Sequence, residues 1–205
     1  MDTNNPPLPT GYSRVPPGML ANVVICLEML AKPPVKADPP GDSLRIERWE
    51  NADPDGYRDL FRRIGEEWMW MSRLVMADED LTAILHDPKV EIHTVMDGER
   101  RVGLLELDFR QDGECELAFF GLAPEAIGSG TGRKLMNAAI DKAWSMPIKR
   151  FWVHTCHFDH PAALAFYQRS GFTPYASYVE VDEDPRLTGQ MRKDAAAHVP
   201  LIEPK

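Results

Sequence analysis

Glycines at alternate positions mark the stretch of this sequence most able to do chemistry. Gly128, Gly130 and Gly132 follow an apolar segment that ends at Leu122. Glycine has no side chain to keep an anion away from the backbone amides, and a helix beginning near Thr131 would direct its positive end at the same place. The spacing therefore predicts a phosphate-binding loop, with a helix entry that binds no ligand as the alternative.

Two common nucleotide-binding loops do not fit this stretch. A Walker loop needs a lysine followed by serine or threonine after its last glycine, whereas Gly132 is followed by Arg133-Lys134-Leu135. A dinucleotide-binding loop needs Gly-x-Gly-x-x-Gly, whereas these glycines read Gly-x-Gly-x-Gly. The sequence thus predicts a phosphate site of another kind.

The composition indicates one globular domain with extensions. The chain has 205 residues, of which 43% are apolar, enough for one well-buried domain. Its formal net charge of −9, from 32 acidic and 23 basic residues, argues against nucleic-acid partners. The acidic excess favours cationic partners, although it would also serve simply to keep the protein soluble.

Cysteine content and hydropathy indicate where the protein works. The three cysteines, Cys26, Cys115 and Cys156, are too few and too irregularly spaced for a disulfide framework. The longest uncharged apolar run, residues 19–27, is too short to span a bilayer and has no basic segment immediately before it. We therefore expect a cytoplasmic protein with no membrane partner.

The apolar pattern predicts the elements that position the glycine loop. After an extended arm, a β-branched segment at 21–29 is expected to add a strand at the edge of the sheet, and a proline-rich linker follows it. The core is predicted to have strands at 43–50, 149–156 and 174–181, helices from Asp53-Pro54, over 78–86, from near Thr131 and from Pro161 to Ser170-Gly171, and an antiparallel three-strand meander over 90–122. Asp159 or His160 would cap the last helix.

This order predicts a mixed α/β fold, in which a mostly antiparallel sheet has helices on both faces. We divide the chain into an N-terminal arm with an added strand (1–42), a core domain (43–181) and a polar, irregular C-terminal tail (182–205). The arm is expected to cover a sheet edge of its own or a neighbouring subunit, which allows a homodimer.

Three motifs within the core domain resemble those of one enzyme family. They are Glu116-Leu-x-x-Phe-x-Leu-x-Pro124, then Gly128-x-Gly130-x-Gly132, then His160-x-x-Ala163-x-x-Phe166-Tyr167-x-x-x-Gly171-Phe172. In this order they resemble the acetyl-coenzyme A motifs of the GNAT superfamily of N-acetyltransferases. The resemblance covers about residues 43–181 and implies a GNAT-like fold.

The resemblance also implies how acetyl-coenzyme A would bind. Backbone amides of the glycine loop would hold the pyrophosphate, and the strand ending at Leu122 would pair with the pantetheine arm and splay from the strand at 151–156. Ile127 stands where the family has Arg or Gln, and His160 where Asn is usual. The implied cofactor-binding residues are Leu122, Ile127, Gly128, Ser129, Gly130, Thr131, Gly132, Arg133, His160, Ala163 and Phe166.

Direct acetyl transfer to an amine also requires an acid and a base. Tyr167 matches the tyrosine that, in the family, often protonates the departing thiolate. Glu116 is our first candidate for the base because it lies on the strand that leads to the cofactor loop, with Glu106 and Asp108 as runners-up. His154, Cys156 and His160 could be arranged as zinc ligands. Because they fall at the strand-to-helix turn beside the expected thioester, we expect no metal.

The expected function is transfer of an acetyl group from acetyl-CoA to a primary amine of a small molecule. The aromatic residues Trp68, Trp70, Tyr175 and Tyr178 and the acidic balance suit a cationic acceptor. A non-catalytic coenzyme A-binding or interaction module with the same fold is the alternative.

Overall fold

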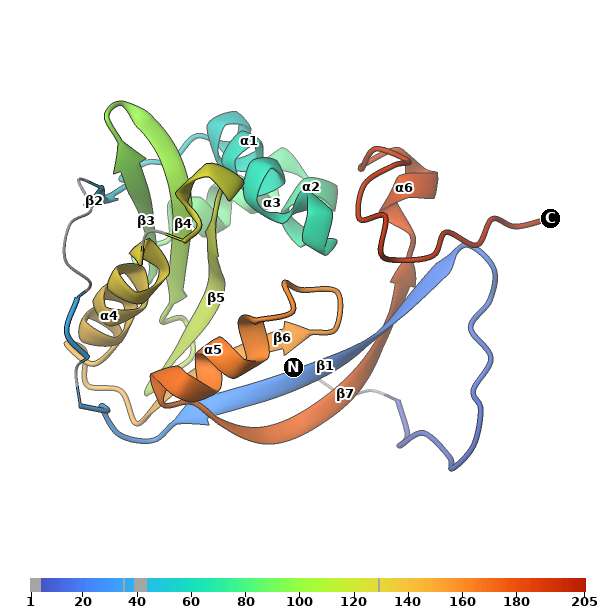
Figure 1. Cartoon of the computed structure of the whole chain (residues 1–205), viewed down its shortest axis with the longest axis horizontal. Helices are drawn as coiled ribbons and strands as arrows, with labels where there is room; N and C mark the ends of the chain where they lie inside the picture. The colour runs from blue at the N-terminus through green and yellow to red at the C-terminus, as the bar shows by residue number, and fades with distance from the viewer. Residues whose placement is uncertain (1–4, 35, 39–43, 129) are drawn as a thin grey trace.

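The computed structural model describes residues 5–34, 36–38, 44–128 and 130–205 (Figure 1). A mixed sheet forms its centre, with the strand order β2-β3-β4-β5-β6-β1-β7. The strands are β1 (Met19–Met29), β2 (Arg45–Arg48), β3 (Val90–Asp97), β4 (Arg100–Asp108), β5 (Glu114–Leu122), β6 (Arg150–Cys156) and β7 (Thr173–Glu183). The helices are α1 (Pro54–Gly65), α2 (Ser72–Val75), α3 (Asp78–Leu85), α4 (Thr131–Ala143), α5 (Ala163–Ser170) and α6 (Pro185–Thr188), with short 3-10 turns η1 (Glu66–Trp68) and η2 (Pro124–Ala126). None of the described helices is long and apolar enough to cross a membrane.

Strands β3, β4 and β5 form the predicted antiparallel meander. Gly98 and Gly113, in the two connecting turns, have φ of +59° and +73°, a region that glycine adopts at little cost. Strand β5 then pairs with β6 in parallel, and α4 lies between these two strands in the sequence. The structure confirms the mixed α/β fold.

Strand β1 does not lie at the edge of the sheet, and that prediction was wrong. It lies between β6 and β7 and is antiparallel to both, so that Val24 faces Cys156 on one side and Tyr178 on the other. Figure 1 shows β1 (blue) running along β7 (orange-red). A β-branched segment suits an interior strand as well as an edge strand, so sequence pattern alone could not decide between the two positions.

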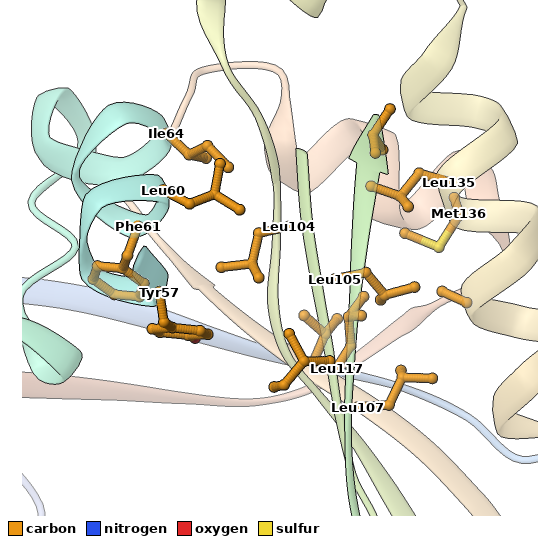
Figure 2. Close-up of a cluster of buried hydrophobic side chains, with 14 of the residues drawn as sticks. Tyr57, Leu60, Phe61, Ile64, Leu104, Leu105, Leu107, Leu117, Leu135 and Met136 are labelled. Atoms are coloured by element: carbon orange, nitrogen blue, oxygen red, sulfur yellow. The ribbon is translucent and has the colours of Figure 1, made fainter. Parts of the chain in front are cut away.

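The core has two layers, one on each face of the sheet. Figure 2 shows Leu104 of β4 directed toward α1 and its neighbour Leu105 directed toward α4, as expected for alternating residues of a strand. Both are fully buried. On α1 the buried apolar side chains are Tyr57, Leu60, Phe61 and Ile64, and on α4 they include Leu135 and Met136. Helices on both faces therefore hold β4 and β5 in place.

Helix α1 begins with a side-chain cap. Asp53 accepts a hydrogen bond from the backbone N–H of Gly56 at 2.7 Å, and Pro54 occupies the first helical position. We expect Asp53→Ala to lower the free energy of unfolding by about 1 kcal/mol. Chemical denaturation measures this loss, and Asp53→Asn, which keeps the acceptor oxygen, is the matched control. An alanine variant as stable as the wild type would contradict the capping role.

The C-terminal tail is packed against the rest of the protein rather than irregular throughout. Strand β7 continues to Glu183, and Asp184 caps α6. The buried guanidinium of Arg186 binds Asp184 and donates to the backbone oxygens of Ala195 and Val199 at 3.3 and 2.8 Å. This anchoring was not predicted because Arg186 binds backbone oxygens as well as Asp184, and backbone oxygens give no signal in the sequence.

Candidate active site

Strands β5 and β6 separate partway along their length. Their parallel pairing covers Glu114–Arg150, Cys115–Phe151 and Glu116–Trp152, and the rest of β5 up to Leu122 leaves β6. A cavity of about 400 Å³ lies at this separation and is lined by residues of both strands. The splayed pair that the resemblance implies is therefore present.

The cavity reaches both faces of the sheet. Phe119 contacts Phe61 of α1 and Trp70, while the next residue, Phe120, contacts Phe166 and Tyr167 of α5. Because neighbouring strand residues point to opposite faces, the cavity has an α5 side and an α1 side. The predicted cofactor residues Leu122, Ile127, Gly132, His160, Ala163 and Phe166 all line the cavity.

The glycine loop lies at the start of α4. Gly128 and Gly130 have φ of +96° and +88°, and Gly130 is the N-cap of the helix. As a glycine it has no side chain to satisfy the first-turn amides, which suits an anionic ligand. A Cβ on Gly128 would meet nothing within 4 Å, so the loop is open. Ser129 lies outside the described residues.

Two arginines add positive charge near this loop. The Nη1 of Arg133 donates to Ser170 Oγ at 3.0 Å, and its guanidinium lies over the ring of Phe166 at 5.0 Å. Burial and the charge of Arg169 lower the pKa of Arg133, and Arg169 itself lines the cavity. An open glycine loop, a helix N-terminus and two arginines fit a pyrophosphate group, as coenzyme A carries.

Tyr167 lies on the α5 side of the cavity. Its ring packs edge-on against Phe120 and Phe172, at centroid distances of 6.3 and 5.9 Å. Within the described chain its hydroxyl forms no hydrogen bond. Burial, and then the charge of Asp159, raise the pKa of Tyr167 above its usual value. The phenol therefore stays protonated throughout the working pH range and can act as a donor toward the cavity.

Asp159 is a cavity residue whose role was missed. One carboxylate oxygen accepts from Trp70 Nε1 at 3.1 Å, and the other accepts from Thr155 Oγ1 at 2.6 Å and from the Cys156 amide at 3.1 Å. Neither Asp159 nor His160 caps α5, whose N-cap is Ala162. The capping prediction fails because Asp159 is bound to the preceding strand instead. No sequence signal links it to Trp70, which is distant in the chain.

The three candidate carboxylates have different surroundings. Glu116 lies 3.5 Å from Nδ1 of His154, and His154, not Glu116, lines the cavity. Glu106 is fully buried and binds the Tyr57 hydroxyl and the Arg73 guanidinium. Asp108 is held by Arg110 in a bidentate pair, with Nε 3.0 Å from Oδ1 and Nη2 2.5 Å from Oδ2. Glu116 is thus the candidate with a link to the cavity.

The histidine and cysteine cluster beside the cavity has other roles. His160 Nδ1 accepts from the Ala162 amide at 3.1 Å, and its ring packs edge-on against Trp68. Burial, and then Asp159, raise the pKa of Cys156 to about 11, which keeps the thiol protonated. In the described ranges, no three His, Cys, Asp or Glu residues are grouped as metal ligands.

The α1 side of the cavity is aromatic and acidic. Trp68 and Trp70 line it, as do Glu180 and Asp182 of β7. Tyr175 packs against Arg150 instead, with the guanidinium 4.5 Å from its ring, and neither Tyr175 nor Tyr178 is a lining residue. Negative charge thus collects on this side, opposite the arginines near the glycine loop.

The sheet opened between two parallel strands, the glycine loop at the start of α4 and the tyrosine beside the gap are the features that the sequence resemblance implies. Residues 44–172 match the model of the Acetyltransferase (GNAT) family. The chain therefore belongs to this family.

Solved structures show the same fold at low sequence identity. A GCN5-related N-acetyltransferase from Sphaerobacter thermophilus has a TM-score of 0.60 and 12% identity, over 80% of this chain and 52% of that one. A conserved protein of unknown function from Staphylococcus epidermidis has a TM-score of 0.58 and 16% identity, over 82% of this chain and 64% of that one. An aminoglycoside acetyltransferase from an uncultured soil metagenomic sample has a TM-score of 0.51 and 20% identity, over 62% of this chain and 87% of that one. This chain thus spans less than two thirds of the first two proteins. No curated protein matches the sequence.

Proposed function

We propose that this protein transfers the acetyl group of acetyl-CoA directly to a primary amine of a small molecule. The observation that supports this most is the cavity at the separation of β5 and β6, which has a basic glycine loop near one side and the carboxylate of Asp159 among its lining residues. An anionic donor and a cationic acceptor can therefore meet in the gap between the strands.

On the cofactor side of the cavity, backbone groups would make the main contacts with acetyl-CoA. Acetyl-CoA would supply an activated acetyl thioester when bound. The amides at the start of α4 would hold its pyrophosphate, while Arg133 and Arg169 add charge. The unpaired edge of β5 up to Leu122 offers backbone hydrogen bonds to an extended ligand. Ile127 can add only apolar contact here.

The acceptor side would bind and deprotonate an ammonium. Asp159 is held in place by three donors and lies where it can attract the cation. For proton removal we propose His154, oriented by Glu116 at 3.5 Å. Tyr167 would then give its proton, or a strong hydrogen bond, to the departing sulfur.

The base assignment predicts a change in pH dependence for Glu116→Gln. A half-exposed ion pair contributes up to about 1 kcal/mol, so turnover near neutral pH should fall about fivefold. The loss should shrink as the pH approaches the amine pKa of about 10, because the acceptor then loses its own proton. Initial rates measured across this pH range check this, and a loss of the same size at every pH would contradict the assignment.

The proposed function is tested by incubating the protein with acetyl-CoA and a panel of small amines while free thiol is measured. We expect thiol release with at least one primary amine and an acetylated product by mass spectrometry. Calorimetry with coenzyme A is run alongside. Binding without thiol release on any amine would replace the proposal with a non-catalytic coenzyme A-binding module.

A further inference from the structure

Two carboxylates face the α1 side of the cavity from β7, beyond β1. Glu180 and Asp182 are alternate residues of β7, and in the sheet register they face Asn22 and Leu20 of β1. Facing residues and alternate residues of paired strands point to the same face, so these four share one face of the sheet, and all four line the cavity. β1 and β7 lie along each other over their whole length (Figure 1).

Asn22, beside these two carboxylates, has a hydrogen-bond acceptor that receives no donor. The residue is 8% exposed, and its Nδ2 donates to Glu180 Oε2 at 2.9 Å. A carboxylate can only accept, so the amide nitrogen must face Glu180, and Oδ1 is left on the other side. In the described structure this buried Oδ1 has no hydrogen-bond partner. Buried acceptors are normally satisfied, so a donor is missing here.

The missing donor is best supplied by a cation. Within the described ranges neither Glu180 nor Asp182 forms an ion pair. Burial, and then the charge of Glu180, raise the pKa of Asp182. The two negative charges therefore repel each other. The lining arginine, Arg169, lies near the glycine loop with Arg133. An ammonium would neutralise the carboxylates and donate to Asn22 Oδ1.

This ammonium is not the one that receives the acetyl group. The reacting amine must lie in the gap between β5 and β6, beside Tyr167 and Asp159. Glu180 and Asp182 lie on β7, two strands beyond β6. Neighbouring strands are about 4.8 Å apart, which separates the two places by roughly 10 Å.

We propose that the acceptor carries a second ammonium, bound by Glu180, Asp182 and the Oδ1 of Asn22, so that the substrate class is a long diamine or polyamine. The inference rests on the proposed function for the chemistry of the first amine. The second site sets which amine is selected and touches no reacting atom. Its contribution should therefore fall on KM and leave kcat nearly unchanged.

The first test compares octylamine with the diamine that has an amine at each end of the same octane chain. For the wild type we expect a KM about tenfold or more lower for the diamine, with similar kcat. The double variant Glu180→Gln/Asp182→Asn should raise the diamine KM to that of octylamine and leave octylamine unaffected. Glutamine at 180 still accepts from Asn22, so the fold is kept.

The matched control is Glu183→Gln, which removes a charge from the same strand on its opposite, exposed face. It should change neither KM. Equal KM values for the two acceptors in the wild type, or a diamine KM raised as much by Glu183→Gln as by the double variant, would overturn the second site.

A binding measurement separates this inference from the proposed function. Calorimetry of the diamine is carried out on the wild type and on the double variant, each with coenzyme A present. If no amine releases thiol, the proposed function fails, and the binding site is still tested. Diamine affinity about tenfold weaker in the variant supports it. Equal affinity in both proteins, or octylamine bound as tightly as the diamine, overturns it.

Discussion

Replacing Gly132 by aspartate should abolish coenzyme A binding while the protein stays folded. Gly132 is the second residue of α4 and lines the cavity. A Cβ there would meet Leu122 Cδ1 at 3.9 Å, an ordinary contact, so the change causes no clash. The new carboxylate would take the anion position and repel the pyrophosphate, which should weaken binding more than about a hundredfold.

The same substitution should stabilise the ligand-free protein slightly. Loss of a helical glycine contributes about 0.5–1 kcal/mol, and a carboxylate at a helix N-terminus contributes about 0.3–1 kcal/mol more. The melting temperature without ligand should therefore rise slightly. Calorimetry measures the affinity, with Gly132→Asn, the neutral match, as the control. A folded aspartate variant with wild-type affinity would show that coenzyme A does not use this helix end.

Tyr167→Phe should lower turnover by about 10²- to 10⁴-fold, the usual contribution of a positioned acid. Its raised pKa makes complete proton transfer to a thiolate more costly than in water, and it also guarantees that the donor is protonated. The hydroxyl has no partner in the described chain, so phenylalanine keeps the packing against Phe120 and Phe172. Coenzyme A affinity and melting temperature should barely change.

Single-turnover rates are the measurement for Tyr167→Phe, because they isolate the chemical step from product release. The control is Phe166→Leu, which alters the neighbouring aromatic surface without removing a donor and should affect cofactor affinity more than rate. Wild-type single-turnover rates in Tyr167→Phe would make this tyrosine a packing residue.

Local signals made much of the fold predictable. The meander follows from two aspartate-glycine turns, and α4 from an apolar stripe after the glycines, because turns and helices depend on neighbouring residues. The glycine loop was found for the same reason. The positive φ angles of this loop occur at Gly128 and Gly130, so the glycines in the sequence indicate them directly.

Long-range relations were not predictable. The interior position of β1 depends on partners at its two sides that lie more than a hundred residues away. Asp159 became visible as a cavity residue only through its bond to Trp70, and Asn22 only through its bond to Glu180. Side chains of the proposed acceptor side thus come from segments with no common motif, whereas those of the proposed cofactor side come from the three motifs on β5, the glycine loop and α5.

The interior position of β1 also sets the order in which the protein can assemble during synthesis. β1 is made before the rest of the sheet, but its partners, β6 and β7, are made last. About 150 residues separate the end of β1 from the end of β7, a wait of roughly 10–30 s at ~5–20 residues per second. Until then at least one edge of this apolar strand is unpaired, which invites aggregation or chaperone binding. Because Asn22 of β1 and the two carboxylates of β7 line the cavity together, this side of the cavity forms only when the first strand of the chain pairs with the last.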